Sequence, residues 1–208
     1  MKTADYLRFG YRTFTAHFAG LLSIGVAIAA SQAIVHWALG FIALRALADA
    51  VEVLLSGLFV AGLFNACRSA ALGRVPRLAD AFEPFVRRPL QALAASAALS
   101  AGLLLFGVGV LITGFLFVFS LLLVCEGDSG WRALLHSKRL VLSNPVRVLA
   151  LLGALALLNL LGALALGIGL LVTTPISLLS LIALRLELES EYTAGSAARG
   201  GSLARHAH

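Results

Sequence analysis

Two long runs without any charged residue constrain this chain more than any other feature of its sequence. They cover residues 90–125 and 148–184, and hold 36 and 37 residues. A single helix of 36 residues would extend about 54 Å, nearly twice the thickness of about 30 Å of a membrane's hydrocarbon core. We therefore predict that each run folds into a hairpin of two membrane-spanning helices. Glycine tolerates the backbone angles of a tight turn, so we place the turns at Gly107-Val108-Gly109 and Gly167-Ile168-Gly169.

Composition and two further apolar runs extend this picture to the whole chain. Hydrophobic residues make up 60% of the 208 residues and charged residues only 12%, whereas soluble domains carry about a quarter charged residues. The sequence predicts an all-α, polytopic bundle of six spans arranged as helical hairpins, forming one membrane domain over residues 1–189. A tail rich in Ala, Gly, Ser and Arg follows over residues 190–208, and this composition predicts disorder. The predicted spans cover residues 13–36, 45–67, 90–106, 110–125, 146–166 and 169–186.

The distribution of positive charge predicts the topology. Of the 16 Lys and Arg residues, 15 lie before the first span, between spans two and three, between spans four and five, or after the last span. With six spans, all four segments fall on one side, and the positive-inside rule makes that side the cytoplasm. The sequence thus predicts a multi-pass protein of the bacterial inner (plasma) membrane with both termini cytoplasmic. Basic residues in short clusters between spans argue against a nucleic-acid partner.

An internal repeat relates the two uncharged runs. The segment from Phe106 to Thr113 matches the segment from Leu166 to Thr173 at an offset of 60 residues, and Ser120-Leu121 matches Ser180-Leu181. A basic stretch precedes each hairpin, at 74–88 and at 129–143. Both copies would begin on the cytoplasmic side, so the repeat is parallel and not inverted. The alternative is a chance match caused by the Leu, Gly and Val content.

The stretch 129–143 predicts a partly amphipathic helix. Trp131, Leu134, Leu135 and Leu142 fall near one helical face, away from the arginines. Such a helix lies either in the headgroup layer with its apolar side down or as a cytoplasmic cap on the bundle. Pro145, after Asn144, is predicted to end it and to begin span five, because proline suits a first helical turn.

These segments carry a family resemblance. The run from Ala133 to Pro145, the Gly167-Ile168-Gly169 turn and Thr173-Thr174-Pro175 together resemble a superfamily of six-helix bacterial membrane proteins. That superfamily includes the membrane domain attached to some glycerophosphoryl diester phosphodiesterases. The resemblance covers roughly residues 50–186 and implies the six-helix architecture. It implies no activity, because no soluble phosphodiesterase domain accompanies the motifs.

Motifs for catalysis and for metal or cofactor binding are absent from the sequence. There is no H-E-x-x-H, G-x-S-x-G, P-loop or C-x-x-C motif. Among the histidines, only His206 and His208 have a spacing that suits a metal. Cys67 and Cys125 are predicted at cytoplasmic ends of spans, where a disulfide does not persist. We therefore expect no enzyme activity, no cofactor and no metal centre.

Four polar residues form the candidate intramembrane site. Arg45, Asp49 and Glu52 lie one helical turn apart near the start of span two. They either form a proton- or cation-binding site near the outer mouth of the bundle, or lie at the wet interface because the span begins later; the second interpretation is favoured. Asn159 lies near the middle of span five, where an asparagine usually bonds a neighbouring helix.

The predicted function is a non-catalytic structural or accessory subunit. Its expected partners are membrane lipids and either a membrane protein or further copies of the chain. The rival is a small transporter or channel for an ion, lipid or small solute, with Glu52, Asp49 and Asn159 in its pathway.

Overall fold

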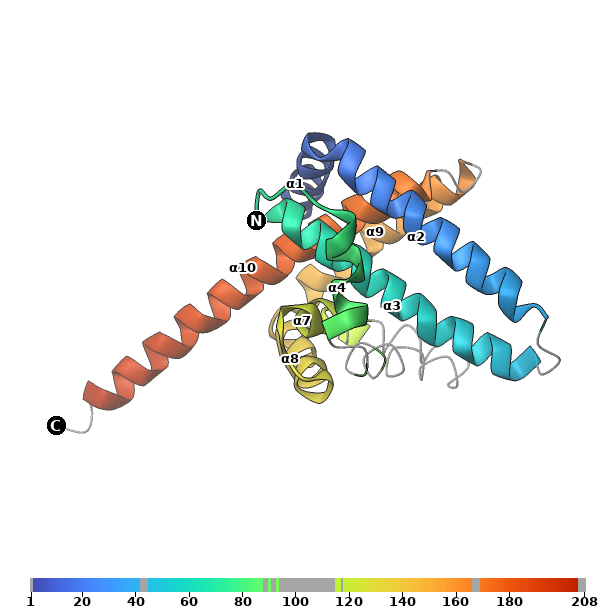
Figure 1. Cartoon of the computed structure of the whole chain (residues 1–208). Coiled ribbons are helices and arrows are strands. Elements are labelled where there is room, and N and C mark those ends of the chain that lie inside the picture. The colour runs from blue at the N-terminus through green and yellow to red at the C-terminus, as the bar shows by residue number, and fades with distance from the viewer. Residues whose placement is uncertain are drawn as a thin grey trace.

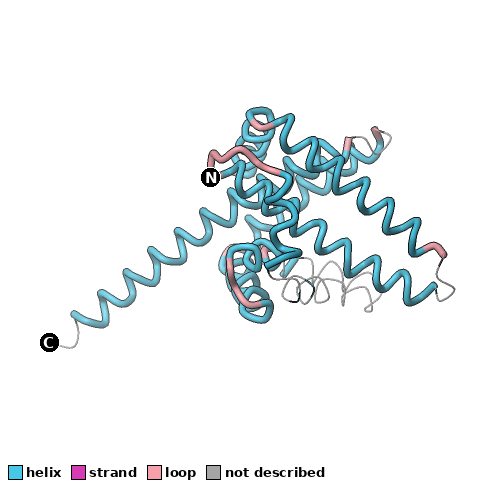
Figure 2. Tube along the Cα trace, viewed as in Figure 1, coloured by secondary structure: helices cyan, strands magenta, loops and turns pink. Residues whose placement is uncertain are grey.

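The structure is a computed structural model that describes residues 2–41, 45–87, 90, 93, 115–116, 118–165 and 169–205. Within these residues it contains eight helices and no strand (Figure 2). The all-helical class predicted from the sequence is thus confirmed for the described part of the chain. The helices are α1 (Thr3–Ala16), α2 (Phe18–Leu39), α3 (Arg45–Ala71), α4 (Leu78–Arg87), α7 (Ser120–Glu126), α8 (Gly130–Ser143), α9 (Pro145–Leu164) and α10 (Leu170–Arg205).

Three of the described helices are long and apolar enough to cross a membrane. They are α2, α9 and the Leu170–Ala194 part of α10, while α3 contains a shorter apolar stretch, Leu55–Ala71. Most of predicted spans three and four, with Gly107-Val108-Gly109, lies outside the described residues, as do Gly167 and Ile168. The chain therefore has helices typical of a membrane protein.

Two pairs of packed helices meet at α10. α2 packs against α3, and α9 packs against α10, which also contacts α3. In Figure 1 the two pairs extend from a shared centre in different directions, and the C-terminal half of α10 leaves on the opposite side. α1 packs on α10, α4 on α3, and the α7–α8 pair on α3 and α10. α10 thus contacts α1, α3, α8 and α9 and forms the centre of the fold.

The N-terminal segment forms two helices, because α1 docks on α10 instead of continuing into α2. Tyr6, Gly10 and Phe14 recur every four residues along α1 and are buried. Gly10 allows the close approach, since a side chain there would collide with the carbonyl oxygen of Ile176 on α10. The chain turns at His17, and the helix that contains the first candidate span begins at Phe18.

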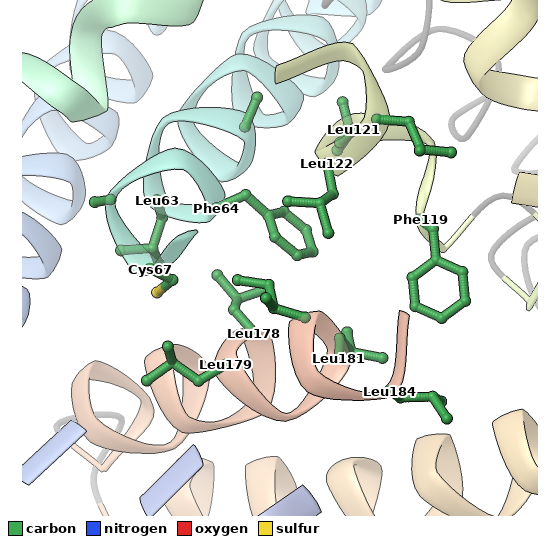
Figure 3. Packing of buried hydrophobic residues seen from close by; sticks show 14 of the residues in the cluster. Leu63, Phe64, Cys67, Phe119, Leu121, Leu122, Leu178, Leu179, Leu181 and Leu184 are labelled. Atoms are coloured by element: carbon green, nitrogen blue, oxygen red, sulfur yellow. The ribbon is translucent and has the colours of Figure 1, made fainter. Parts of the chain in front are cut away.

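An apolar core fills the junction of α3, α7 and α10. In Figure 3, Phe64 of α3 points between Leu122 of α7 and Leu181 of α10. All three side chains are buried. Close packing of this kind holds helices together within a membrane, because lipid tails are as apolar as leucine and give helix association no hydrophobic driving force.

α8 packs one face on the bundle and splits the predicted apolar face, because Leu134 is buried. Ala133, Ser137 and Leu140 are buried, so this face caps the bundle, while Trp131 and Leu135 are exposed. The predicted break after α8 is confirmed, because α8 ends at Ser143 and α9 begins at Pro145.

The C-terminal segment is helical where we expected disorder from residue 190. α10 continues through Arg205. Arg147 of α9 contacts Glu191. Composition alone missed this ion pair, which ties the first turn of the extension to the bundle.

Candidate functional site

Charged side chains from three helices converge where α3, α7 and α10 meet. The Arg185 guanidinium of α10 donates a hydrogen bond of 2.8 Å to Glu126 at the end of α7, and its Nη2 lies 2.9 Å from a carboxylate oxygen of Glu189. Nε of Arg68, on α3, lies 3.3 Å from Glu126 Oε1. We call these four residues the arginine–glutamate cluster.

The cluster stands at the end of the apolar segments. Glu126 directly follows the uncharged run 90–125, and Arg185 directly follows the run 148–184. Only 5% of Arg185 is exposed. A charge in such a place is costly unless it is paired, so it usually marks either a structural contact or a functional site. Here two guanidinium groups face two carboxylates.

The ion pairs of the cluster do not fully offset the cost of burying its charged groups. Burial raises the pKa of Glu126, and the neighbouring Arg185 and Arg68 oppose that rise. Nε of Arg185 is buried without a hydrogen-bond partner among the described residues. A cavity of about 360 Å³ adjoins the cluster and is also lined by the apolar side chains of Leu72 and Ile182. The arrangement can hold three helices together.

A second polar network ties α1 and α9 to α10. The Tyr6 hydroxyl donates a hydrogen bond of 2.9 Å to Glu187. Arg147 lies 3.5 Å from Glu187 and 2.9 Å from Glu191. Burial, followed by the hydrogen bond to Glu187, raises the pKa of Tyr6 to about 12. Tyr6 is therefore held as a neutral hydrogen-bond donor.

A pocket with a cationic lining lies between α8 and α10. Its volume is about 410 Å³. His136 Nδ1 lies 3.2 Å from Asp128 Oδ2, whereas Arg132 and Arg139 are exposed on the surface of α8. We call it the basic pocket, and its lining residues are Asp128, Arg132, Leu135, His136, Arg139, Leu140 and Tyr192.

The predicted trio at the start of span two is only partly described. Arg45 and Asp49 belong to α3, but their side chains lie outside the described part of the structure. Glu52 accepts a hydrogen bond of 2.9 Å from His36 of α2. A small cavity of about 190 Å³ beside Glu52 is also lined by Gln32 and Ser56. Glu52 is thus placed between α2 and α3.

Asn159 makes the interhelical hydrogen bond expected of it. Its Nδ2 donates to Ser177 Oγ of α10 at 2.9 Å and to the Leu155 carbonyl oxygen at 3.0 Å. Within the described residues, Asn159 Oδ1 and Thr173 Oγ1 are buried without a partner. The interaction joins α9 to α10, and no described contact links Asn159 with Glu52.

Sequence reasoning missed the arginine–glutamate cluster. It treated Arg68 and Arg185 only as topology signals, and Glu126 only as the end of an uncharged run. The available signal was that Glu126 and Arg185, which directly follow the two uncharged runs, carry opposite charges. That signal required knowing that α7 and α10 meet.

The described residues contain no group of three or more His, Cys, Asp and Glu side chains that could hold a metal ion. No family model, curated protein or solved structure matches this chain.

Proposed function

We propose that this chain is a non-catalytic structural or accessory membrane protein that acts through contacts with lipid at one membrane surface. The surface of α8 carries the proposal, because it exposes Trp131 and Leu135 beside Arg132 and Arg139. Apolar side chains next to basic ones are typical of helices that lie in the headgroup layer. α8 also directly precedes α9, a candidate span, so it lies near a membrane surface.

In this proposal the chain crosses the bacterial inner membrane six times, with both termini in the cytoplasm. The grouping of basic residues and the resemblance to six-helix bacterial membrane proteins support that topology. The hairpins 90–125 and 146–186 are then parallel repeats. Ser120 and Ser180, which are equivalent in the repeat, are both fully buried, and this equal burial is consistent with the repeat.

Thiol labelling tests the topology. A membrane-impermeant reagent added to intact cells should label a cysteine substituted at Val108 or at Ile168, and should leave the native Cys67 and Cys125 unlabelled. Labelling of a cysteine placed at Arg77, on the predicted cytoplasmic side, would contradict the six-span topology.

Purification in mild detergent tests the accessory role. We expect anionic lipid, and either a membrane-protein partner or further copies of the chain, to co-purify with it. A preparation that retains neither lipid nor protein after repeated detergent exchange would contradict the proposed function.

A small transporter is the second candidate, and the region around Asn159 favours it. Asn159 Oδ1 and Thr173 Oγ1 have no hydrogen-bond partner in the described part of the chain, and polar groups at such depth often line a transport pathway. Asn159→Leu should abolish flux in reconstituted vesicles if the transporter is correct. In the accessory protein it should cost only about 1 kcal/mol of interhelical bonding.

A further inference from the structure

The surface of α8 is divided into three sectors. At about 100° per residue, the residues buried against the bundle fill one side, among them Ala133, Ser137 and Leu140. The exposed Trp131, Leu135 and Leu142 lie within about 40° of one another. Arg132, His136 and Arg139 fall in the adjoining sector, about 60° wide. We call the second sector the apolar stripe, and the third sector lines the basic pocket.

The arginines of this pocket differ from those of the bundle. Arg68, Arg147 and Arg185 each contact a carboxylate. In the described part of the chain, Arg132 and Arg139 form no ion pair; the one carboxylate of the pocket, Asp128, contacts His136. Two guanidinium groups therefore face the pocket against one carboxylate, and the charge favours an anionic ligand.

The position of the pocket indicates which anion suits it. Tyr192 of α10 closes one side, about 10 Å along the helix beyond Arg185, where the uncharged run ends. The pocket thus lies beyond the uncharged run 148–184, and we place it at headgroup level. The apolar stripe beside it provides a surface for acyl chains. A phospholipid has such chains, whereas a soluble phosphate has none.

We propose that the basic pocket binds the phosphodiester of an anionic phospholipid, with Arg132 and Arg139 contacting the phosphate and the apolar stripe contacting the acyl chains. Guanidinium groups suit this role because their planar donors match phosphate oxygens. This inference rests on the proposed function and names the lipid-binding site that the function requires.

Native mass spectrometry of the full chain, released from vesicles of equimolar phosphatidylglycerol and phosphatidylcholine, tests the inference. The wild type should retain phosphatidylglycerol in preference to phosphatidylcholine. R132Q/R139Q should lower that preference by about fivefold for each arginine, because both guanidinium groups line the pocket proposed to hold the phosphate. The control R74Q/R77Q removes two exposed arginines from the 72–77 loop and should change the preference less than twofold.

The outcomes separate this inference from the proposed function. If the wild type shows no preference for the anionic lipid, both fail. If R132Q/R139Q keeps the wild-type preference, the pocket is not the site, whereas lipid binding by the protein stands. If excess inorganic phosphate displaces the lipid completely, the site recognises phosphate alone and the proposed lipid site is wrong. If W131A/L135A turns a dimer into a monomer at unchanged lipid preference, the apolar stripe contacts another copy, and the inference is overturned.

Discussion

α3 carries charged residues toward both ends, and the described ion pairs at the two ends differ in how deeply they are buried. Near the C-terminal end, Arg68 joins the arginine–glutamate cluster, in which the Arg185 side chain is 6% exposed and the Glu126 side chain 19%. Near the N-terminal end, the described ion pair joins Glu52 to His36, and their side chains are 40% and 74% exposed. An ion pair that water can replace contributes little, whereas a buried charge that loses its partner is strongly destabilising. The stabilising role of charge should therefore be concentrated at one end of α3.

Removing Arg185 should have the largest effect. Arg185→Met leaves Glu126 with only the longer contact to Arg68, and removes the partner of Glu189. We expect a loss of about 3–5 kcal/mol in the free energy of unfolding, measured by titration from mild detergent into dodecyl sulfate. The control Arg74→Met removes an exposed arginine and should cost less than about 0.5 kcal/mol. If the two variants lose equal free energy of unfolding, the buried Arg185 contributes no more than an exposed arginine, and the stabilising role given to the cluster is wrong.

The cost of Arg185→Met should also depend on pH. Burial already raises the pKa of Glu126, and loss of Arg185 should raise it further. A carboxyl whose pKa is higher in the folded state holds its proton there at pH values where the unfolded chain has released it. Lowering the pH from 8 toward the ordinary glutamate pKa of about 4.3 should therefore reduce the difference between variant and wild type. A difference that stays constant over this range would contradict the role given to Glu126.

Tyr6→Phe should have an intermediate effect. The variant loses the hydrogen bond to Glu187, and bonds to charged groups contribute about 1.5–3 kcal/mol. The pKa of Tyr6 is raised to about 12, so its contribution is present below the ordinary tyrosine pKa of about 10 and is lost as pH rises toward 12. Unfolding measured from pH 8 to pH 12 should show this decline in the wild type but not in Tyr6→Phe. Tyr11→Phe, which changes an exposed tyrosine, should match the wild type throughout.

The elements with strong local signals could be predicted from the sequence. The length of the runs without charged residues indicated the apolar helices α2, α9 and α10. Pro145 indicated the boundary between α8 and α9. The docking of α1 was missed because the buried Tyr6 and Gly10 find their partners on α10, more than 160 residues away in the chain. A pattern read along one segment contains no information about which distant segment it packs against.

The candidate site was harder to predict for a related reason. Glu52 and Asn159 were selected because each is polar within an apolar stretch, and each contacts one neighbouring helix. Glu126 and Arg185 stand at the ends of apolar runs, where charge is ordinary, and burial there arises only when α3, α7 and α10 meet. Burial of a terminal charge depends on tertiary packing, which hydropathy does not report.

Glu52→Gln should have the smallest effect, and it also tests the transporter. An exposed ion pair contributes about 0–1 kcal/mol, and glutamine retains a side-chain oxygen that can accept a hydrogen bond from His36. We therefore expect a change of no more than about 0.5 kcal/mol in the free energy of unfolding and no change in proton or cation flux through reconstituted vesicles. His36→Gln, which removes the other partner, should behave in the same way. A pH-dependent flux that disappears in Glu52→Gln while the protein stays folded and inserted would make the cavity beside Glu52 part of a transport pathway. The exposed end of α3 would then carry the function, and the buried end only the stability.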